Sequence, residues 1–299
     1  MRAVWSFWSR PFLAQKGWAW RSPLHHLLAW GLSVAAASRH YPDTLLVTDR
    51  FGKELLADTL GLPFANVSTE LERLSEADPD WWALGKLVAY SLQDRPFVHI
   101  DTDAFLWKPL PPEVAVAPVF AQCPEYFPRV QRRSWEIERA LGDAHLPVEW
   151  RWAVSRDDVF IREENCGIVG GNRVDFLRYY AQTAIDLVLR PEHARAWTGC
   201  VKSNTVIEQF LLAACVDFHR FHPDSPYRGV RVRYLFPSWD DASNPANATR
   251  AGFTHLLGDA KSHPLVGRRI EARVRRDDQA YFRRCEKAAA HMSDSPVRI

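Results

Sequence analysis

Short strand-like runs alternate with longer amphipathic segments along the 299-residue chain. This alternation is typical of an α/β fold with a mostly parallel central sheet flanked by helices. No clean linker interrupts it, so we expect a single domain over residues 1–299. Strands are expected at 3–7, 44–48, 64–67, 97–100, 114–121, 230–236 and 252–257, and helices at 22–39, 51–60, 79–93, 173–190, 204–216 and 276–290.

The composition is that of an ordinary globular protein, with 47% hydrophobic and 25% charged residues. A formal net charge of +2 is too small to attract a nucleic-acid backbone, so no nucleic-acid partner is expected. The longest apolar stretch, 27–37, is shorter than the roughly 20 residues that cross a bilayer. It also lies too deep in the chain for a signal peptide. We therefore expect a cytoplasmic protein, and five cysteines without metal-type spacing suit a reducing compartment.

Tryptophan is unusually frequent, with 13 residues, seven of them before residue 83. A tryptophan face can stack on the apolar face of a sugar ring, and more often it fills a packed core. The sequence leaves both readings open.

Two aspartates, Asp101 and Asp103, follow the most strand-like run in the chain, Phe97–Ile100. Ligands of open α/β sheets bind at the carboxyl ends of the strands, where these side chains are expected to lie. Two carboxylates one residue apart can reach a single divalent cation, and hard oxygen ligands suit Mn²⁺ or Mg²⁺. A solvated turn is the alternative reading for an isolated Asp-x-Asp.

A second group of residues begins within the strand-like run 252–257, at His255, and continues after it to Lys261. His255 can add an imidazole nitrogen to the two carboxylates, and Lys261 can neutralise a phosphate. Gly258 lies between them, and a glycine lets the backbone approach a phosphate closely. Together with Asp101 and Asp103 these residues predict a site for a metal-bound diphosphate.

An Asp-x-Asp motif after a strand, followed much later by His-x-x-Gly-x-x-Lys, resembles the retaining GT-A transferases related to glycogenin and the bacterial lipopolysaccharide galactosyltransferases. The resemblance implies a Rossmann-like GT-A fold, Asp101, Asp103 and His255 as metal ligands, and a nucleotide-sugar donor, with a UDP-sugar expected. It also implies further residues that contact the donor. It implies as well that an acidic residue followed by glutamine faces the sugar and forms the catalytic pair. The donor-binding residues would be Ser6, Asp49, Lys86, Asp101, Asn165, Gly167 and Lys261, and the catalytic pair Glu208 and Gln209.

The implied activity is transfer of a sugar from a nucleotide-diphosphate sugar to an acceptor, with retention of configuration. The cation and Lys261 would stabilise the charge that develops on the departing diphosphate. Two alternatives stay open: a non-catalytic protein that binds nucleotide sugars, and a metal-dependent phosphohydrolase or nucleotidyltransferase.

The acceptor is not predicted beyond a saccharide, a lipid-linked saccharide or a peptide. The polar, arginine-rich segment 125–164 has no counterpart in the resemblance and is expected on the acceptor side. The basic helix expected at 276–290 could rest on the inner face of an anionic membrane, as basic amphipathic helices do.

Overall fold

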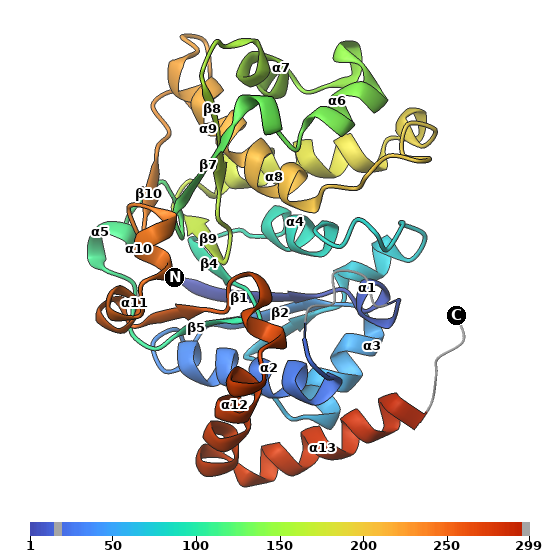
Figure 1. Ribbon diagram of the computed structural model, residues 1–299, viewed down its shortest axis with the longest axis vertical. Helices are drawn as coiled ribbons and strands as arrows, with labels where there is room; N and C mark the ends of the chain where they lie inside the picture. The colour runs from blue at the N-terminus through green and yellow to red at the C-terminus, as the bar shows by residue number, and fades with distance from the viewer. Residues whose placement is uncertain (15–19, 295–299) are drawn as a thin grey trace.

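A seven-stranded sheet forms the middle of the computed structural model, which describes residues 1–14 and 20–294 (Figure 1). Its order is β10-β6-β9-β4-β1-β2-β3, and β9 alone among these seven runs antiparallel to its neighbours. The mostly parallel α/β sheet expected from the sequence is therefore confirmed. The strands are β1 (Arg2–Phe7), β2 (Thr44–Thr48), β3 (Asn66–Ser68), β4 (Phe97–Ile100), β6 (Val119–Ala121), β9 (Ile168–Gly171) and β10 (Val232–Tyr234).

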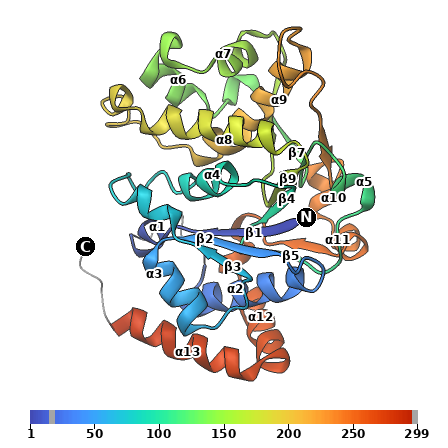
Figure 2. The same cartoon turned by 180° about the vertical axis from the view of Figure 1, so that it is seen from behind.

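Helices cover both faces of this sheet (Figures 1 and 2). One face carries α4 (Leu84–Ser91), α8 (Val174–Leu189) and α9 (Leu211–Phe221), and the other carries α2 (Pro23–Ser38), α12 (Pro264–Asp277) and α13 (Gln279–Asp294). No helix among the described residues is long and apolar enough to cross a membrane. The shorter helices are α1 (Ser9–Leu13), α3 (Arg50–Gly52), α5 (Pro112–Ala115), α6 (Trp135–Leu141), α7 (Val148–Ser155), α10 (Trp239–Ser243) and α11 (Pro245–Ala251).

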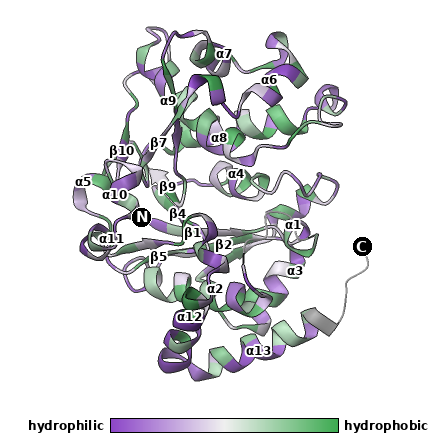
Figure 3. Ribbon diagram, in the orientation of Figure 1, coloured by the Kyte–Doolittle hydropathy of each residue, from purple (hydrophilic) through white to green (hydrophobic). Residues whose placement is uncertain are grey.

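Alternation along the strands builds a hydrophobic cluster on each face of the sheet. In β1, Val4 belongs to the cluster under α4 and α8, whereas Trp5 and Phe7 belong to the cluster on α2. This follows from the two-residue period of a strand. Helix α2 is apolar because it is buried between the sheet and α13, while α12 is mainly hydrophilic (Figure 3).

A small antiparallel sheet joins the two sequence motifs. Strand β5 (Ala104–Leu106) pairs with β11 (Phe253–His255), with Ala104 opposite His255. The amide of Leu256 also donates to the carbonyl of Asp103 at 3.0 Å. Residues about 150 positions apart are thus held side by side by backbone hydrogen bonds. Strand β5 was not expected from the sequence.

Three predicted element boundaries need correction. The strand expected at 114–121 is a strand only at 119–121, because Pro111 and Pro112 favour the start of helix α5 instead. Helix α4 begins at Leu84 rather than at 79, and β3 begins at Asn66 rather than at 64.

Two predicted regions are more structured than expected. Segment 125–164 contains the hairpin of β7 (Pro124–Pro128) and β8 (Phe160–Glu164) together with α6 and α7. The basic helix expected at 276–290 corresponds to α13, which begins at Gln279. A further helix that was not expected, α12, precedes it, and the chain leaves the helical conformation at Asp278 between the two. All five cysteines are free, and four of them are buried.

A serine inside the apolar helix α2 ties the sheet to the Asp-x-Asp turn. The Ser33 hydroxyl accepts from the Trp5 indole at 2.9 Å and donates to the carbonyl of Ala104 at 2.8 Å. Both hydrogen bonds are buried. Ser33 therefore satisfies two polar groups that the surrounding hydrophobic cluster could not.

We expect Ser33→Ala to lower the free energy of unfolding by about 1–3 kcal/mol, because it leaves the Trp5 indole and the Ala104 carbonyl buried without a partner. Urea denaturation measures this. Ser155→Ala is the control, since that exposed hydroxyl bonds within its own helix turn, and it should change stability by less than about 0.5 kcal/mol. Equal effects of the two substitutions would contradict the role of Ser33.

Candidate functional site

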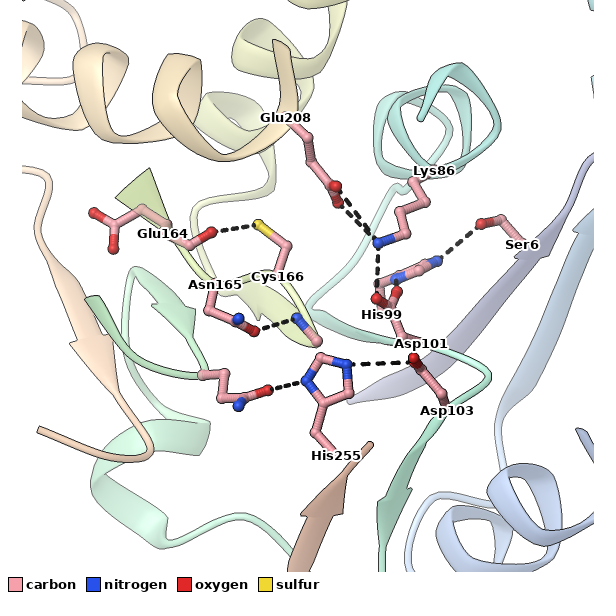
Figure 4. A network of polar contacts seen from close by, with 12 residues as sticks. Ser6, Lys86, His99, Asp101, Asp103, Glu164, Asn165, Cys166, Glu208 and His255 are labelled. Carbon is pink, nitrogen blue, oxygen red and sulfur yellow. Dashed lines mark hydrogen bonds and ion pairs between the residues drawn. The ribbon is translucent and has the colours of Figure 1, made fainter. Parts of the chain in front are cut away.

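Asp101, Asp103 and His255 meet at the carboxyl end of β4 (Figure 4). Their potential ligand atoms all lie within 4.8 Å of one another. Asp101 directly follows β4, Asp103 directly precedes β5, and His255 is the last residue of β11. The pairing of β5 with β11 therefore produces the cluster that the two motifs predicted.

The cluster has the donor atoms that a divalent cation requires. Asp101 Oδ1 is buried and has no hydrogen-bond partner among the described residues. The His255 Nε2 atom lies 3.4 Å from Asp103 Oδ1. Two carboxylates and an imidazole suit Mn²⁺ or Mg²⁺, and a cation would satisfy the unpartnered oxygen. The residues thus fit the metal that the resemblance implies.

Lys261 forms an ion pair with Asp103 Oδ2. It comes from a short 3-10 helix, Gly258–Ser262, that follows β11. Gly258 enters this helix with a φ of 54°, a conformation that favours glycine. Burial would raise the pKa of Asp103, but His255 and Lys261 hold it well below its usual range. Asp103 is therefore ionised and ready to accept a cation.

A second cation, Lys86 on α4, lies between two carboxylates. Its Nζ is 2.8 Å from Asp101 Oδ2 and 3.3 Å from Glu208 Oε1. The Tyr90 hydroxyl donates to the same Glu208 oxygen at 2.8 Å. Glu208 is fully buried in a π-helical turn, Val206–Phe210, a geometry frequent at functional sites.

The charges around Lys86 depend on one another. Burial raises the pKa of Glu208 and of Asp101, and Lys86 counteracts the rise at both carboxylates. Burial would lower the pKa of Lys86, yet Asp101 and Glu208 raise it above its usual value. Lys86 therefore stays positively charged while buried.

A cavity of about 280 Å³ opens beside these charges. Asp101, Asp103, Lys86 and Lys261 lie along it, and Ser6 and His99 line it as a hydrogen-bonded pair with 3.0 Å between Oγ and Nε2. Its remaining wall is strongly aromatic: Phe7, Trp8, Phe12, Trp20, Trp30 and Trp82, with His26 among them. Part of the tryptophan excess thus lines the cavity, and part, such as Trp5 and Trp150, is fully buried core.

Asn165 and Gly167 lie next to the metal ligands. The Asn165 side-chain oxygen accepts from the Gly167 amide at 3.0 Å, and its side-chain nitrogen donates to Glu125 at 2.6 Å. The Gly167 carbonyl in turn accepts from the amide of Asp101 at 3.0 Å. This pair therefore positions the turn before β9 against the Asp-x-Asp motif.

Six sequence-predicted residues lie outside the cavity lining: Asn165, Gly167 and His255, described above, and Asp49, Glu208 and Gln209. Asp49 caps α3, with its carboxylate accepting from the amides of Ser9 at 2.7 Å and Gly52 at 2.8 Å. Glu208 lies behind Lys86, and Gln209 follows it, half-buried, in the same π-helical turn.

Sequence reasoning missed several residues of the site. His99 interrupts an otherwise apolar strand, which was a usable signal for a buried polar role. Gln122, whose side-chain oxygen lies 2.7 Å from His255 Nδ1, gave no signal because it belongs to no motif. His26 gave no signal either, because it lies in the mainly apolar helix α2.

Comparison with known proteins assigns the chain to a family. A model described as a family of unknown function, DUF6734, matches residues 1–288. The chain belongs to the DUF6734 family. No curated protein matches this DUF6734 sequence.

Two solved structures are similar to this DUF6734 protein. An active-site mutant of LgtC is 12% identical over 86% of this chain and 88% of that chain, with a TM-score of 0.40. The apo form of mouse xyloside xylosyltransferase 1 is 12% identical over 88% of this chain and 98% of that chain, with a TM-score of 0.38. Similarities this distant transfer no residue role and no substrate.

We expect Lys86→Met to destabilise the DUF6734 protein by about 3 kcal/mol or more, because it leaves Asp101 and Glu208 as buried carboxylates without their shared cation. Adding Glu208→Gln to this variant should restore part of the loss. Lys53→Met, in an exposed ion pair with Asp58, is the control and should cost less than about 1 kcal/mol. Urea unfolding curves decide, and a Lys86→Met protein as stable as wild type would refute the buried charge network.

The stability of the DUF6734 protein should also fall between pH 6.5 and pH 4 because of His26. Burial lowers its pKa from 6.5 to about 4, so in this window the unfolded chain binds more protons than the folded one. Relative to His26→Gln, the free energy of unfolding of the metal-free wild type should drop by about 2–3 kcal/mol as the pH falls across the window. Parallel pH profiles of the two proteins would show that His26 titrates normally.

Proposed function

We propose that this protein is a metal-dependent glycosyltransferase that moves a sugar from a nucleotide-diphosphate sugar, with a UDP-sugar as the expected donor, to an acceptor. The observation that carries the proposal is the meeting of three features at one cavity. These are a divalent-cation cluster, Asp101–Asp103–His255, a lysine beside it, Lys261, and an aromatic wall. A nucleotide sugar offers a matching partner for each of them.

The charged end of the cavity suits a diphosphate. The carboxylates of Asp101 and Asp103 and the imidazole of His255 would hold Mn²⁺ or Mg²⁺, which when bound stabilises negative charge on phosphate oxygens as a Lewis acid. Lys261 can leave its ion pair with Asp103 and donate to a phosphate oxygen once a cation satisfies that carboxylate. The aromatic wall offers stacking faces for the base or the sugar.

Glu208 supports the reaction through Lys86 rather than as a nucleophile. Its side chain is fully buried, and its oxygens are engaged by Tyr90 and Lys86. It fixes the position and the charge of Lys86, which lines the cavity and can donate to a sugar hydroxyl or a phosphate. Because Glu208 is not accessible as a nucleophile, retention would come from attack on the side of the leaving group.

A phosphohydrolase is a weaker proposal for this geometry. Two-metal phosphohydrolases need further carboxylates to hold a second cation about 4 Å from the first. The third acidic group here is Glu208, and the ammonium of Lys86 lies between it and Asp101. That position is already occupied by positive charge, which disfavours a second metal.

The decisive assay incubates the full chain with a panel of UDP- and GDP-sugars and Mn²⁺, with and without EDTA. We expect slow, EDTA-sensitive release of nucleoside diphosphate, because transferases hydrolyse their donors in the absence of an acceptor. Release of nucleoside monophosphate would instead identify a pyrophosphatase. Donor binding without any product would identify a non-catalytic binding protein.

Asp103→Asn should reduce metal-dependent donor turnover by more than about 100-fold while the protein stays folded, because it removes a ligand charge from the cation. Asp259→Asn is the matched control, since this exposed aspartate belongs to the same 3-10 helix as Lys261 and should leave turnover unchanged. Nucleoside diphosphate release measures both. Turnover at the wild-type rate in Asp103→Asn would refute the assignment of the site.

A further inference from the structure

We propose that Gln122 is a positioning residue that fixes the tautomer of His255, so that the imidazole presents a lone pair to the cation. The inference rests on the proposed metal-dependent function. Gln122 directly follows β6 and is 1% exposed. Its side-chain oxygen lies 2.7 Å from His255 Nδ1, a contact that joins positions 133 residues apart.

The chemistry of an amide oxygen determines the tautomer. This oxygen can only accept, so the contact requires a hydrogen on His255 Nδ1. A neutral imidazole then carries its lone pair on Nε2. Metal-binding histidines commonly use their second nitrogen in this way, donating to an oxygen that orients the ring.

The surroundings of Nε2 suit a cation, and in the metal-free protein a second proton on His255, shared with Asp103, can take the place of that cation. Nε2 lies 3.4 Å from Asp103 Oδ1, which is also an acceptor. Two acceptors facing each other repel unless a cation or a proton lies between them. The arrangement therefore becomes favourable when a divalent ion binds to Asp103 and to the His255 nitrogen together.

The backbone holds Gln122 firmly at the junction of three elements. Its amide donates to the carbonyl of Asn165 at 3.0 Å, and its carbonyl accepts from the amide of Phe236 at 2.8 Å. The side chain therefore starts from a fixed point and reaches a histidine whose own position is fixed by the pairing of β5 with β11. Little freedom remains for either partner of the contact.

Gly167 leaves the space in which the two side chains meet. A Cβ atom on Gly167 would lie 2.3 Å from both Gln122 Oε1 and His255 Nδ1, far inside contact distance. Any side chain at this position would push the pair apart. The glycine is therefore needed for the hydrogen bond between Gln122 and His255, besides its backbone contact to Asp101.

The reverse orientation of the amide has an opposite consequence. The Gln122 nitrogen would then donate to Nδ1, and the histidine hydrogen would move to Nε2. That nitrogen could donate to Asp103 but would have no lone pair left for a metal. The two orientations thus predict different tautomers in the metal-free protein.

NMR of the metal-free, ¹⁵N-labelled full chain distinguishes the tautomers through long-range ¹H–¹⁵N correlations of the imidazole rings. Comparison with His255→Ala assigns the signals of His255. We expect the Nδ1-protonated form in wild type and a mixture of both forms in Gln122→Ala. A His255 in wild type with its hydrogen on Nε2 and none on Nδ1 would overturn the inference.

Mn²⁺ binding, followed by electron paramagnetic resonance of the free ion, measures the effect on the site. Gln122→Ala and Gly167→Ala should each weaken Mn²⁺ affinity by about 10- to 100-fold. Gln122→Glu should keep the affinity within a few-fold of wild type or increase it, because a carboxylate also accepts from Nδ1. Gln131→Ala, an exposed glutamine, is the control and should bind like wild type.

A double variant separates positioning from general damage to the fold. In a His255→Ala background, Gln122→Ala should cause no further loss of Mn²⁺ affinity, because Gln122 acts through the histidine. Additive losses would overturn the inference, and so would wild-type affinity in Gln122→Ala. Urea unfolding of each variant confirms that the protein measured is folded.

Failure of the inference and failure of the proposed function give different results. If Asp103→Asn and His255→Ala bind Mn²⁺ as wild type does, the metal site and the proposed function fall together. If both lose Mn²⁺ while Gln122→Ala retains it, the metal site stands and only the role of Gln122 is wrong. The NMR measurement needs no metal and tests the tautomer in either case.

Discussion

The pairing of β5 with β11 is the interaction on which the candidate site depends. A few backbone hydrogen bonds place Ala104 opposite His255 and thereby join the Asp-x-Asp turn to the segment that carries Lys261. Without this register the imidazole and the lysine would not reach Asp103. The sheet below supplies the aspartates, but the small antiparallel pair makes them part of the candidate metal site.

Buried charge is the second constraint. Two lysines and three carboxylates form one group, in which Lys261 pairs with Asp103 and Lys86 pairs with both Asp101 and Glu208, so that each carboxylate faces a cation. Burying unpaired charge is costly. Tyr90, behind the cavity, therefore donates a hydrogen bond to the buried carboxylate of Glu208. A ligand that brings its own charges, a cation together with phosphates, would rearrange these pairs without leaving a charge uncompensated.

The sequence allowed the strands of the parallel sheet and the residues of the Asp101–Asp103–His255 cluster to be predicted, because both depend on local patterns. The run Phe97–Ile100 is apolar since it is central, and the aspartates follow it directly. Other features depend on contacts between distant segments. The partnership of Gln122 with His255, the burial of Glu208 behind Lys86, and the use of Asp49 as a helix cap have no local signature. The segment 125–164, for which no helix or strand was predicted, contains a hairpin and two helices.

The separation of the paired segments along the chain also determines when the site can form. Asp103 and Lys261 are 158 positions apart, so most of the chain must be in place before the last ligands arrive. Contacts that close long loops carry a large entropic cost and tend to form late in folding. The cation cluster is therefore among the last parts of the molecule to be completed. A metal ion that binds it would discriminate between a fully folded chain and a nearly folded one, and would slow the unfolding of the former.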